Sequence, residues 1–247
     1  MADEPQPSSS GRARLAGALR HLIDLNVSAR VDDLTFIAAA ESVEAVTASL
    51  EAARQPGRAS RPQPKFDGSR EGYFPTSPIV GGLSPVAPPV SISVAETEDG
   101  AREIRGTAWF GYAYEGPSTF VHGGVLAELF DELLGAAGIA AGRPGLTGTL
   151  TIKFRRPTPL RADLRVEARF IAQEGRKIHS WAGVYHADVL TAEADGVFIE
   201  VGPEQYLSLA AANADSSGSR LADVIGIDAK SVSKKTAERI GFDRDGD

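Results

Sequence analysis

Apolar residues recur along the chain with different spacings, and these spacings predict the order of its elements. Over residues 14–55 they return every three or four positions, which predicts two helices with a break near Asn26–Arg30. Residues 56–89 hold so many prolines that we expect an extended connector, docked on the next domain through its few apolar residues. We expect the polar ends to be a disordered arm over residues 1–13 and a partly helical tail over 203–247.

Residues 90–202 form the compact part of the predicted structure. Residues 123–141 contain no proline and are apolar on most sides, which predicts one long buried helix. Alternation of apolar and polar residues predicts strands at 90–95, 104–114, 147–155, 163–173, 177–189 and 191–201. The order is two strands, the helix, and then four strands that we expect to form a meander. It lacks the regular strand–helix alternation of a parallel sheet, so the fold class is α+β.

Composition removes several classes of function. None of the 247 residues is a cysteine, which excludes a disulfide scaffold, a thiolate nucleophile and a cysteine-bound metal. The net charge of −7 argues against nucleic-acid binding. We find no apolar run long enough for a membrane helix and no secretory signal at the start, so we expect a cytoplasmic protein without a membrane partner.

The start of the predicted buried helix is the first feature that suggests chemistry. His122, Gly123 and Gly124 stand there, where the first N–H groups have no partner within the helix. Glycine has no Cβ, so a ligand can come close to this backbone. Free N–H groups and the positive end of the helix dipole suit an oxygen that carries negative charge, such as the oxyanion of a tetrahedral intermediate.

Asp131 is the second feature. It lies almost two turns after Gly124 on the same predicted helix, among apolar neighbours, and a partly buried carboxylate needs a partner or a function. Glu128 and Glu132 are rivals, but their angular positions lie farther from the glycines. The residues alone leave two readings open, a functional carboxylate and a polar residue on a solvated strip.

These features also carry a family resemblance. The motif His122-Gly123-Gly124, Asp131 nine residues after the histidine, and Gly135 is similar to that of the hotdog-fold acyl-CoA thioesterases of the phenylacetate-pathway type and related thioesterase superfamily members. The likeness extends over roughly residues 78–202. It includes the threonine-bearing strand that ends in Arg156-Pro-Thr-Pro-Leu160, and the segment Gly175-Arg-Lys-Ile178.

The resemblance implies a fold and a mechanism. The fold would be a curved antiparallel sheet wrapped around the central helix, with extra N-terminal helices, and two subunits would pair their sheets with the active sites in the interface. Asp131 would act as general base or as nucleophile. The N–H of Gly123, next to Gly124, would hold the thioester oxygen, and His122 would help to position that carbonyl. Thr147, contributed from the other subunit, would orient the water.

The substrate implied is an acyl-CoA, which is hydrolysed to the free acid and CoA without a cofactor or a metal. Basic residues at strand ends could pair with the CoA phosphates, and the candidates are Arg155, Arg156, Arg176 and Lys177. Many relatives carry Asn-Pro where this chain has Ser84-Pro85, so the shorter serine could alter rate or specificity. Neither acyl chain length nor head group can be read from the sequence.

Two other functions compete with hydrolysis. One is a hotdog module that binds acyl-CoA without turning it over, although such a module would not need a buried Asp131. The other is an enoyl-CoA hydratase, which would need a paired catalytic histidine that we do not find around His122, His179 or His186. In each case we expect a homodimer or homotetramer, because a single six-stranded sheet leaves an open edge.

Overall fold

The computed structural model describes residues 10–54, 73–202 and 205. Two helices come first, α1 (Gly11–Ser28) and α2 (Asp33–Ala52). Strands β1 (Val90–Glu96) and β2 (Arg102–Ala108) precede a short 3₁₀ helix, η1 (Tyr112–Tyr114), and the long helix α3 (Gly123–Ala140). The chain then forms four strands: β3 (Gly145–Phe154), β4 (Leu164–Glu174), β5 (Lys177–His186) and β6 (Val189–Glu200).

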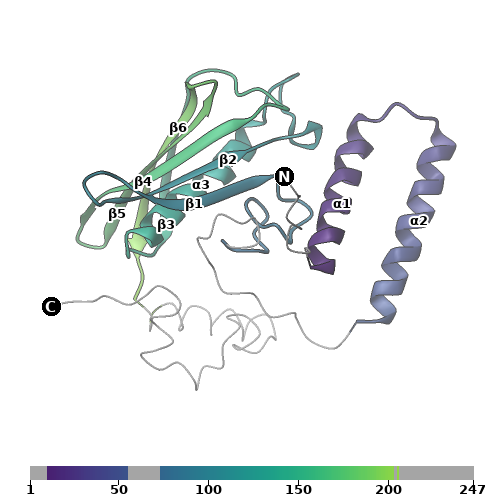
Figure 1. Cartoon of the computed structure of the whole chain (residues 1–247), viewed down its shortest axis with the longest axis horizontal. Coiled ribbons are helices and arrows are strands. Elements are labelled where there is room, and N and C mark those ends of the chain that lie inside the picture. The colour runs from purple at the N-terminus through teal and green to yellow at the C-terminus, as the bar shows by residue number, and fades with distance from the viewer. Residues whose placement is uncertain (1–9, 55–72, 203–204, 206–247) are drawn as a thin grey trace, which may run out of the picture.

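The six strands form one antiparallel sheet with the order β1-β2-β4-β5-β6-β3 (Figure 1). The predicted meander is therefore confirmed only for β4, β5 and β6. We expected β3 to pair with the strand that follows it, which is wrong, because β3 lies at the far edge and pairs with β6. The tight β5–β6 connection uses two residues with positive φ, Ala187 (46°) and Asp188 (62°), as a two-residue hairpin requires.

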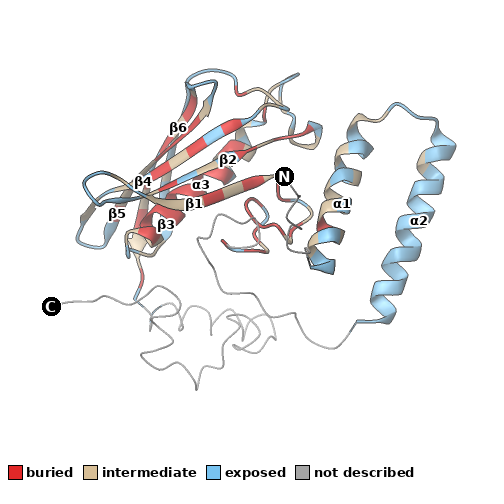
Figure 2. Ribbon diagram, viewed as in Figure 1, coloured by how far each residue is buried: buried red, intermediate tan, exposed pale blue. Residues whose placement is uncertain are grey.

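Helix α3 packs on one face of the sheet and contributes more core residues than any single strand (Figure 2). Leu129, Phe130, Leu133 and Leu134 are fully buried, which explains why apolar residues occur on most sides of this helix. Inward-facing residues of β4, β5 and β6 complete the core, among them Val166, Ala182, Val184, Ala194 and Phe198. No helix within the described residues is both long and apolar enough to cross a membrane.

Both ends of α3 are closed by local hydrogen bonds. The side chain of His122 caps its first turn. At its end Gly142 has a φ of 71°, its N–H donates to the carbonyl of Ile139, and the N–H of Arg143 donates to the carbonyl of Gly138. This is a Schellman motif, which a residue in the left-handed region makes possible. The helix therefore has a fixed length and a fixed start.

Strand β2 ends earlier than the sequence predicts. We expected a strand over residues 104–114, but it stops at Ala108, and η1 occupies the last part of that range. The apolar residues after Ala108 have another role: Phe110 is fully buried and packs edge-on against Tyr114, with ring centroids 5.7 Å apart. Core packing, and not strand pairing, accounts for the apolar pattern here.

Segment 73–89, which we call the strap, packs on the domain, and α1 holds it there. Tyr73, Ile79, Val80 and Ala87 of the strap are buried. On α1, Arg20 donates from Nε to the carbonyl of Ala87 (2.5 Å) and from Nη2 to that of Ser84 (2.8 Å). Asp24, one turn later, accepts a hydrogen bond from the N–H of Ala113 (3.2 Å). Two polar side chains thus join α1 to the strap and to η1.

Replacing Arg20 with methionine tests this attachment. The change keeps the apolar stem but leaves two carbonyls of the strap without their donor, so we expect the free energy of unfolding to fall by about 2 kcal/mol, because hydrogen bonds of charged groups are among the stronger ones. Urea titration measures it. Arg14→Met, at an exposed position of the same helix, is the control and should change little. Equal stability of the two variants would contradict the attachment.

Candidate active site

Hydrogen bonds hold the turn before α3 in place and link it, through η1, to the strap. The N–H of His122 donates to the carbonyl of Tyr114 (2.9 Å), and the hydroxyl of Tyr114 donates to the carbonyl of Val86 in the strap (3.0 Å). Gly116 allows the turn to close, because a Cβ at this position would lie 2.8 Å from Cα of His122. Arg20, the strap, Tyr114 and His122 are thus connected in series.

His122 caps α3 with its side chain. Nδ1 accepts from the N–H of Gly124 at 3.0 Å, so in the neutral ring the proton lies on Nε2 of this exposed residue. The N–H of Gly124 is thereby used within the chain. The N–H groups of Gly123 and Val125 have no hydrogen-bond partner among the described residues. The first turn of α3 therefore offers the N–H of Gly123 to a ligand, as the sequence predicts, while that of Gly124 serves the cap.

Asp131 lies on α3, half-buried, and it has one clear partner. The hydroxyl of Thr147 donates to Oδ1 of Asp131 at 2.7 Å. A β-bulge in β3 between Thr147 and Thr149 places Thr147 on the side of the sheet that faces the helix. The structure thus brings together the two side chains that the motif singles out. It places them in one chain, so the expectation that Thr147 comes from the other subunit is wrong.

Glu132, which the sequence analysis named only as a rival of Asp131, is a half-buried acid that lies beside it. Oε1 of Glu132 accepts from the hydroxyl of Ser77 at 2.5 Å, which joins α3 to the strap. Burial raises the pKa of Glu132; the hydrogen bond from Ser77 opposes this, and the charge of Asp131 adds to it. Burial also raises the pKa of Tyr73, with Glu132 and Asp131 adding to the effect. No sequence pattern indicates this pairing, because Ser77 and Glu132 are 55 residues apart.

The basic candidates for CoA phosphates form two separate pairs. Arg155 and Arg156 follow the end of β3, where Arg155 is paired with Glu193. Arg176 and Lys177 lie at the β4–β5 turn, where Arg176 donates to the carbonyl of Glu200 (3.1 Å). Glu200 pairs with Gly145 at the start of β3, so the two pairs lie near opposite ends of this strand. Within one chain they do not form a single phosphate site.

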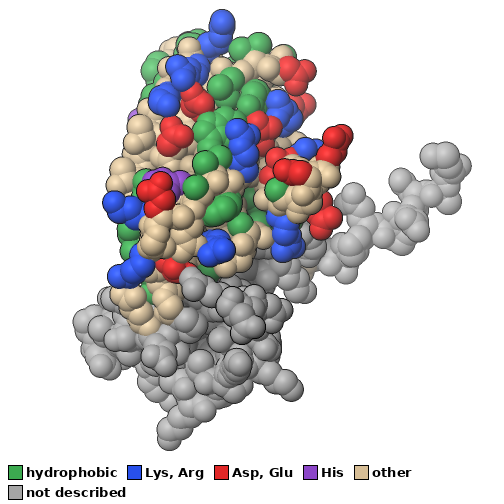
Figure 3. Space-filling view, turned by 90° about the vertical axis from the view of Figure 1, so that its left-hand side faces the viewer, with side chains coloured by type: hydrophobic (Ala, Val, Ile, Leu, Met, Phe, Trp, Pro, Cys, Tyr) green, Lys and Arg blue, Asp and Glu red, His purple; other side chains and the backbone are tan. Residues whose placement is uncertain are grey.

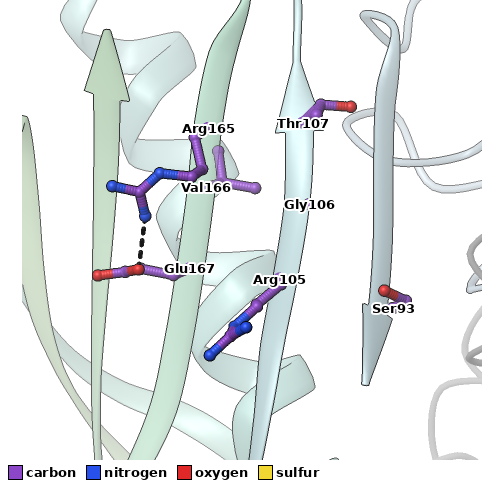
Figure 4. Close-up of a pocket in the computed structure, with 7 residues that line it drawn as sticks. All are labelled: Ser93, Arg105, Gly106, Thr107, Arg165, Val166 and Glu167. Carbon is purple, nitrogen blue, oxygen red and sulfur yellow. Dashed lines mark hydrogen bonds and ion pairs between the residues drawn. The ribbon is translucent and has the colours of Figure 1, made fainter. Parts of the chain in front are cut away.

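A depression of about 510 Å³ lies on the other side of the sheet (Figure 4). Its lining comes from β1, β2 and β4: Ser93, Arg105, Gly106, Thr107, Arg165, Val166 and Glu167. Its two arginines are already paired, Arg105 with Glu103 and Arg165 with Glu167. Neither Asp131 nor the start of α3 reaches it. We therefore place the candidate active site on the helix side of the sheet.

A six-stranded antiparallel sheet wrapped on one long helix, with a glycine turn at the helix start, defines a hotdog domain. Comparison with known proteins agrees. Residues 119–192 match the family model of the thioesterase superfamily. The crystal structure of protein RHA08564, a thioesterase superfamily protein, aligns over 78% of this chain and 93% of that chain, with a TM-score of 0.68 and 28% identity. Over residues 119–192 the hotdog domain of this chain is thus similar to the thioesterase superfamily, and its fold is that of the thioesterase superfamily protein RHA08564.

Two curated relatives carry the name acyl-coenzyme A thioesterase THEM4. The protein of Mus musculus is 32% identical over 100 residues, which is 40% of this chain and 43% of that protein. The protein of Xenopus laevis is 31% identical over 91 residues, or 36% of this chain and 41% of that protein. The chain thus matches less than half the length of these relatives.

The raised pKa of Glu132 predicts a dependence of stability on pH. The folded chain holds this proton more tightly than the unfolded chain, so folding loses stability as the pH rises above the ordinary value of 4.5 towards the raised pKa. Glu132→Gln keeps an acceptor for Ser77 and removes the titration. The free energy of unfolding of Glu132→Gln, relative to that of the unmodified protein, should therefore rise with pH across this interval.

Urea titrations at a series of pH values measure this difference. Glu128→Gln, at an exposed position of the same helix, is the control and should run parallel to the unmodified protein. A stability difference for Glu132→Gln that stays constant with pH would contradict the burial of an ionisable Glu132.

Proposed function

We propose that this chain hydrolyses acyl-CoA thioesters, with Asp131 as the general base. The observation that carries the proposal is the hydrogen bond from Thr147 to Asp131 on the helix that also offers the free N–H of Gly123. The names of the curated relatives support the substrate class. The similarity of the domain to the thioesterase superfamily supports the reaction class.

The hydrogen bond from Thr147 arranges Asp131 for this role. It occupies Oδ1 and leaves Oδ2 free to accept a proton, while the lone pairs of the Thr147 hydroxyl can accept from the same water. The water attacks the thioester carbonyl carbon and gives its proton to Asp131. The carbonyl oxygen becomes an oxyanion, which the N–H of Gly123 stabilises at the helix start. The carbon–sulfur bond then breaks, and the sulfur of CoA takes the proton from Asp131, so that CoA leaves as the free thiol and the carboxylate is restored.

Helix geometry supports a site whose two halves come from different chains. Gly123 and Asp131 are eight residues apart on α3, which separates them by about 12 Å along the axis. One carbonyl group cannot contact both. We propose that Gly123 and His122 of one protomer face Asp131 and Thr147 of the other, so that a two-fold dimer holds two equivalent sites.

The free edge of β3 supports such a dimer. Among the described residues this strand pairs with β6 alone, most of its residues are exposed, and Leu146 (47%) and Phe154 (58%) expose apolar side chains near its ends. The face of the molecule shown in Figure 3 likewise exposes apolar side chains between charged ones. Antiparallel pairing of two β3 strands would give hydrogen-bond partners to the backbone N–H and C=O groups along this edge. It would also place Arg155 near the partner's Arg176, so that the two separate basic pairs would form one phosphate site.

A panel of acyl-CoAs tests the proposal, with release of free thiol as the readout. The unmodified protein should turn over at least one of them. Asp131→Asn should lower kcat by at least about a hundredfold, because general base catalysis contributes this much or more. Glu128→Gln, on an exposed part of the same helix, should leave the rate unchanged.

The outcomes separate the alternatives. Failure to hydrolyse any acyl-CoA, together with measurable CoA binding by calorimetry, would instead indicate a binding module. Normal turnover by Asp131→Asn would show that another residue is the base.

A further inference from the structure

Helix α2 is a long helix that buries no residue against the other described residues of its own chain. It has twenty residues, none of them buried, and in Figures 1 and 2 it lies beyond α1, away from the sheet. Isolated helices of this length are only marginally stable in water, and most helices gain their stability from the packing of an apolar face. Some surface outside this protomer's described residues must therefore cover α2.

Five apolar residues of α2 form a seam along one side of the helix, while Leu34 (77% exposed) and Ile37 (48%) lie outside it. Phe36, Ala39, Val43, Val46 and Leu50 follow one another at intervals of three, four, three and four residues. This is the spacing of the a and d positions of a heptad, which places all five on one side of the helix. The exposed fractions of Val43 (38%), Val46 (51%) and Leu50 (54%) show that the seam is open along most of its length.

The charges on α2 indicate what kind of surface fits this seam. From Thr35 onward the positions that flank it, e and g of the heptad, are uncharged: Thr35, Ala40, Ser42, Thr47 and Ser49. Asp33 lies in the first turn, before the seam begins; the other acidic residues, Glu41, Glu44 and Glu51, lie on the other side of the helix, and α2 contains no lysine or arginine. A second copy of α2 can therefore approach closely without repulsion between like charges, because each copy turns its acidic side to solvent.

We propose that α2 pairs with α2 of a second copy of this chain along the seam Phe36–Leu50. The two surfaces match because they are the same heptad, and their small flanking residues allow close packing. In Figure 1 α2 and the edge strand β3 lie on different sides of the molecule, so this contact is separate from the β3 edge. If β3 forms the dimer of the proposed function, α2 pairs join two dimers into a closed tetramer.

The particle mass tests whether α2 joins copies. Light scattering during gel filtration should give a multiple of the 26.0 kDa chain. The double variant Val43→Glu, Val46→Glu should halve this mass, while the acyl-CoA hydrolase rate per chain stays unchanged. The control is Ala45→Glu, Ala48→Glu, which adds the same charge to the same helix outside the seam and should keep the full mass. A monomeric unmodified protein, or an unchanged mass of the seam variant, would overturn the proposal.

Cross-linking tests which surface α2 meets. The chain has no cysteine, so single cysteines can be introduced without background. We expect that under oxidation at least one of Ala39→Cys, Val43→Cys, Val46→Cys and Leu50→Cys forms a disulfide dimer, whereas Ala45→Cys does not. If the mass falls in the seam variant but no seam position cross-links, a different surface covers α2, and the α2–α2 pairing is wrong. Both readouts are independent of hydrolysis, so a failure of the proposed function leaves this test intact.

Discussion

Helix α3 carries both chemical groups of the proposed site, and its rigidity keeps them about 12 Å apart. The N–H of Gly123 is free at its first turn, and the Asp131 carboxylate lies more than two turns further along, held by Thr147. This fixed distance is the basis of the proposal that each site is shared between two protomers. The exposed edge of β3 and the separation of the two basic pairs support the same proposal, since pairing of two β3 strands would bring these groups together.

The parts of the chain outside the sheet hold the start of α3 in place. Arg20 of α1 binds the strap, the strap binds Tyr114, and Tyr114 binds His122. From the other side, Glu132 binds Ser77 of the strap next to Asp131. The strap therefore contacts α3 directly at Glu132 and is linked to its start through Tyr114. Ser84 belongs to this strap, and its backbone carbonyl is one of the two that Arg20 binds.

Local pattern was enough to predict most elements, because periodicity reports which face of a segment is buried. It predicted α3 almost to its ends, and it predicted the strands β4, β5 and β6. It could not place β3, because an exposed edge strand and an inner strand can alternate in the same way, and pairing is decided between distant residues. The error in β2 has a similar origin, since Phe110 is apolar for the core and not for a strand.

The motif correctly paired Asp131 with Thr147, but only their contact shows that both lie in one chain. Glu132 with Ser77, and Arg20 with the strap, join segments far apart in the sequence, so no spacing reveals them.

Subunit complementation tests the shared site most directly. Gly123→Pro removes the N–H at the first position of α3, where proline is well tolerated and His122 already has the extended conformation that proline requires before it. Gly123→Pro and Asp131→Asn chains should each be inactive. A mixture that has exchanged subunits should recover about a quarter of the normal activity, because half of the dimers are mixed and each of these rebuilds one of two sites. Asp131→Asn mixed with Thr147→Val should recover nothing beyond the activity of the separate variants, since both changes affect the same half. Recovery in the second mixture and not in the first would contradict the account.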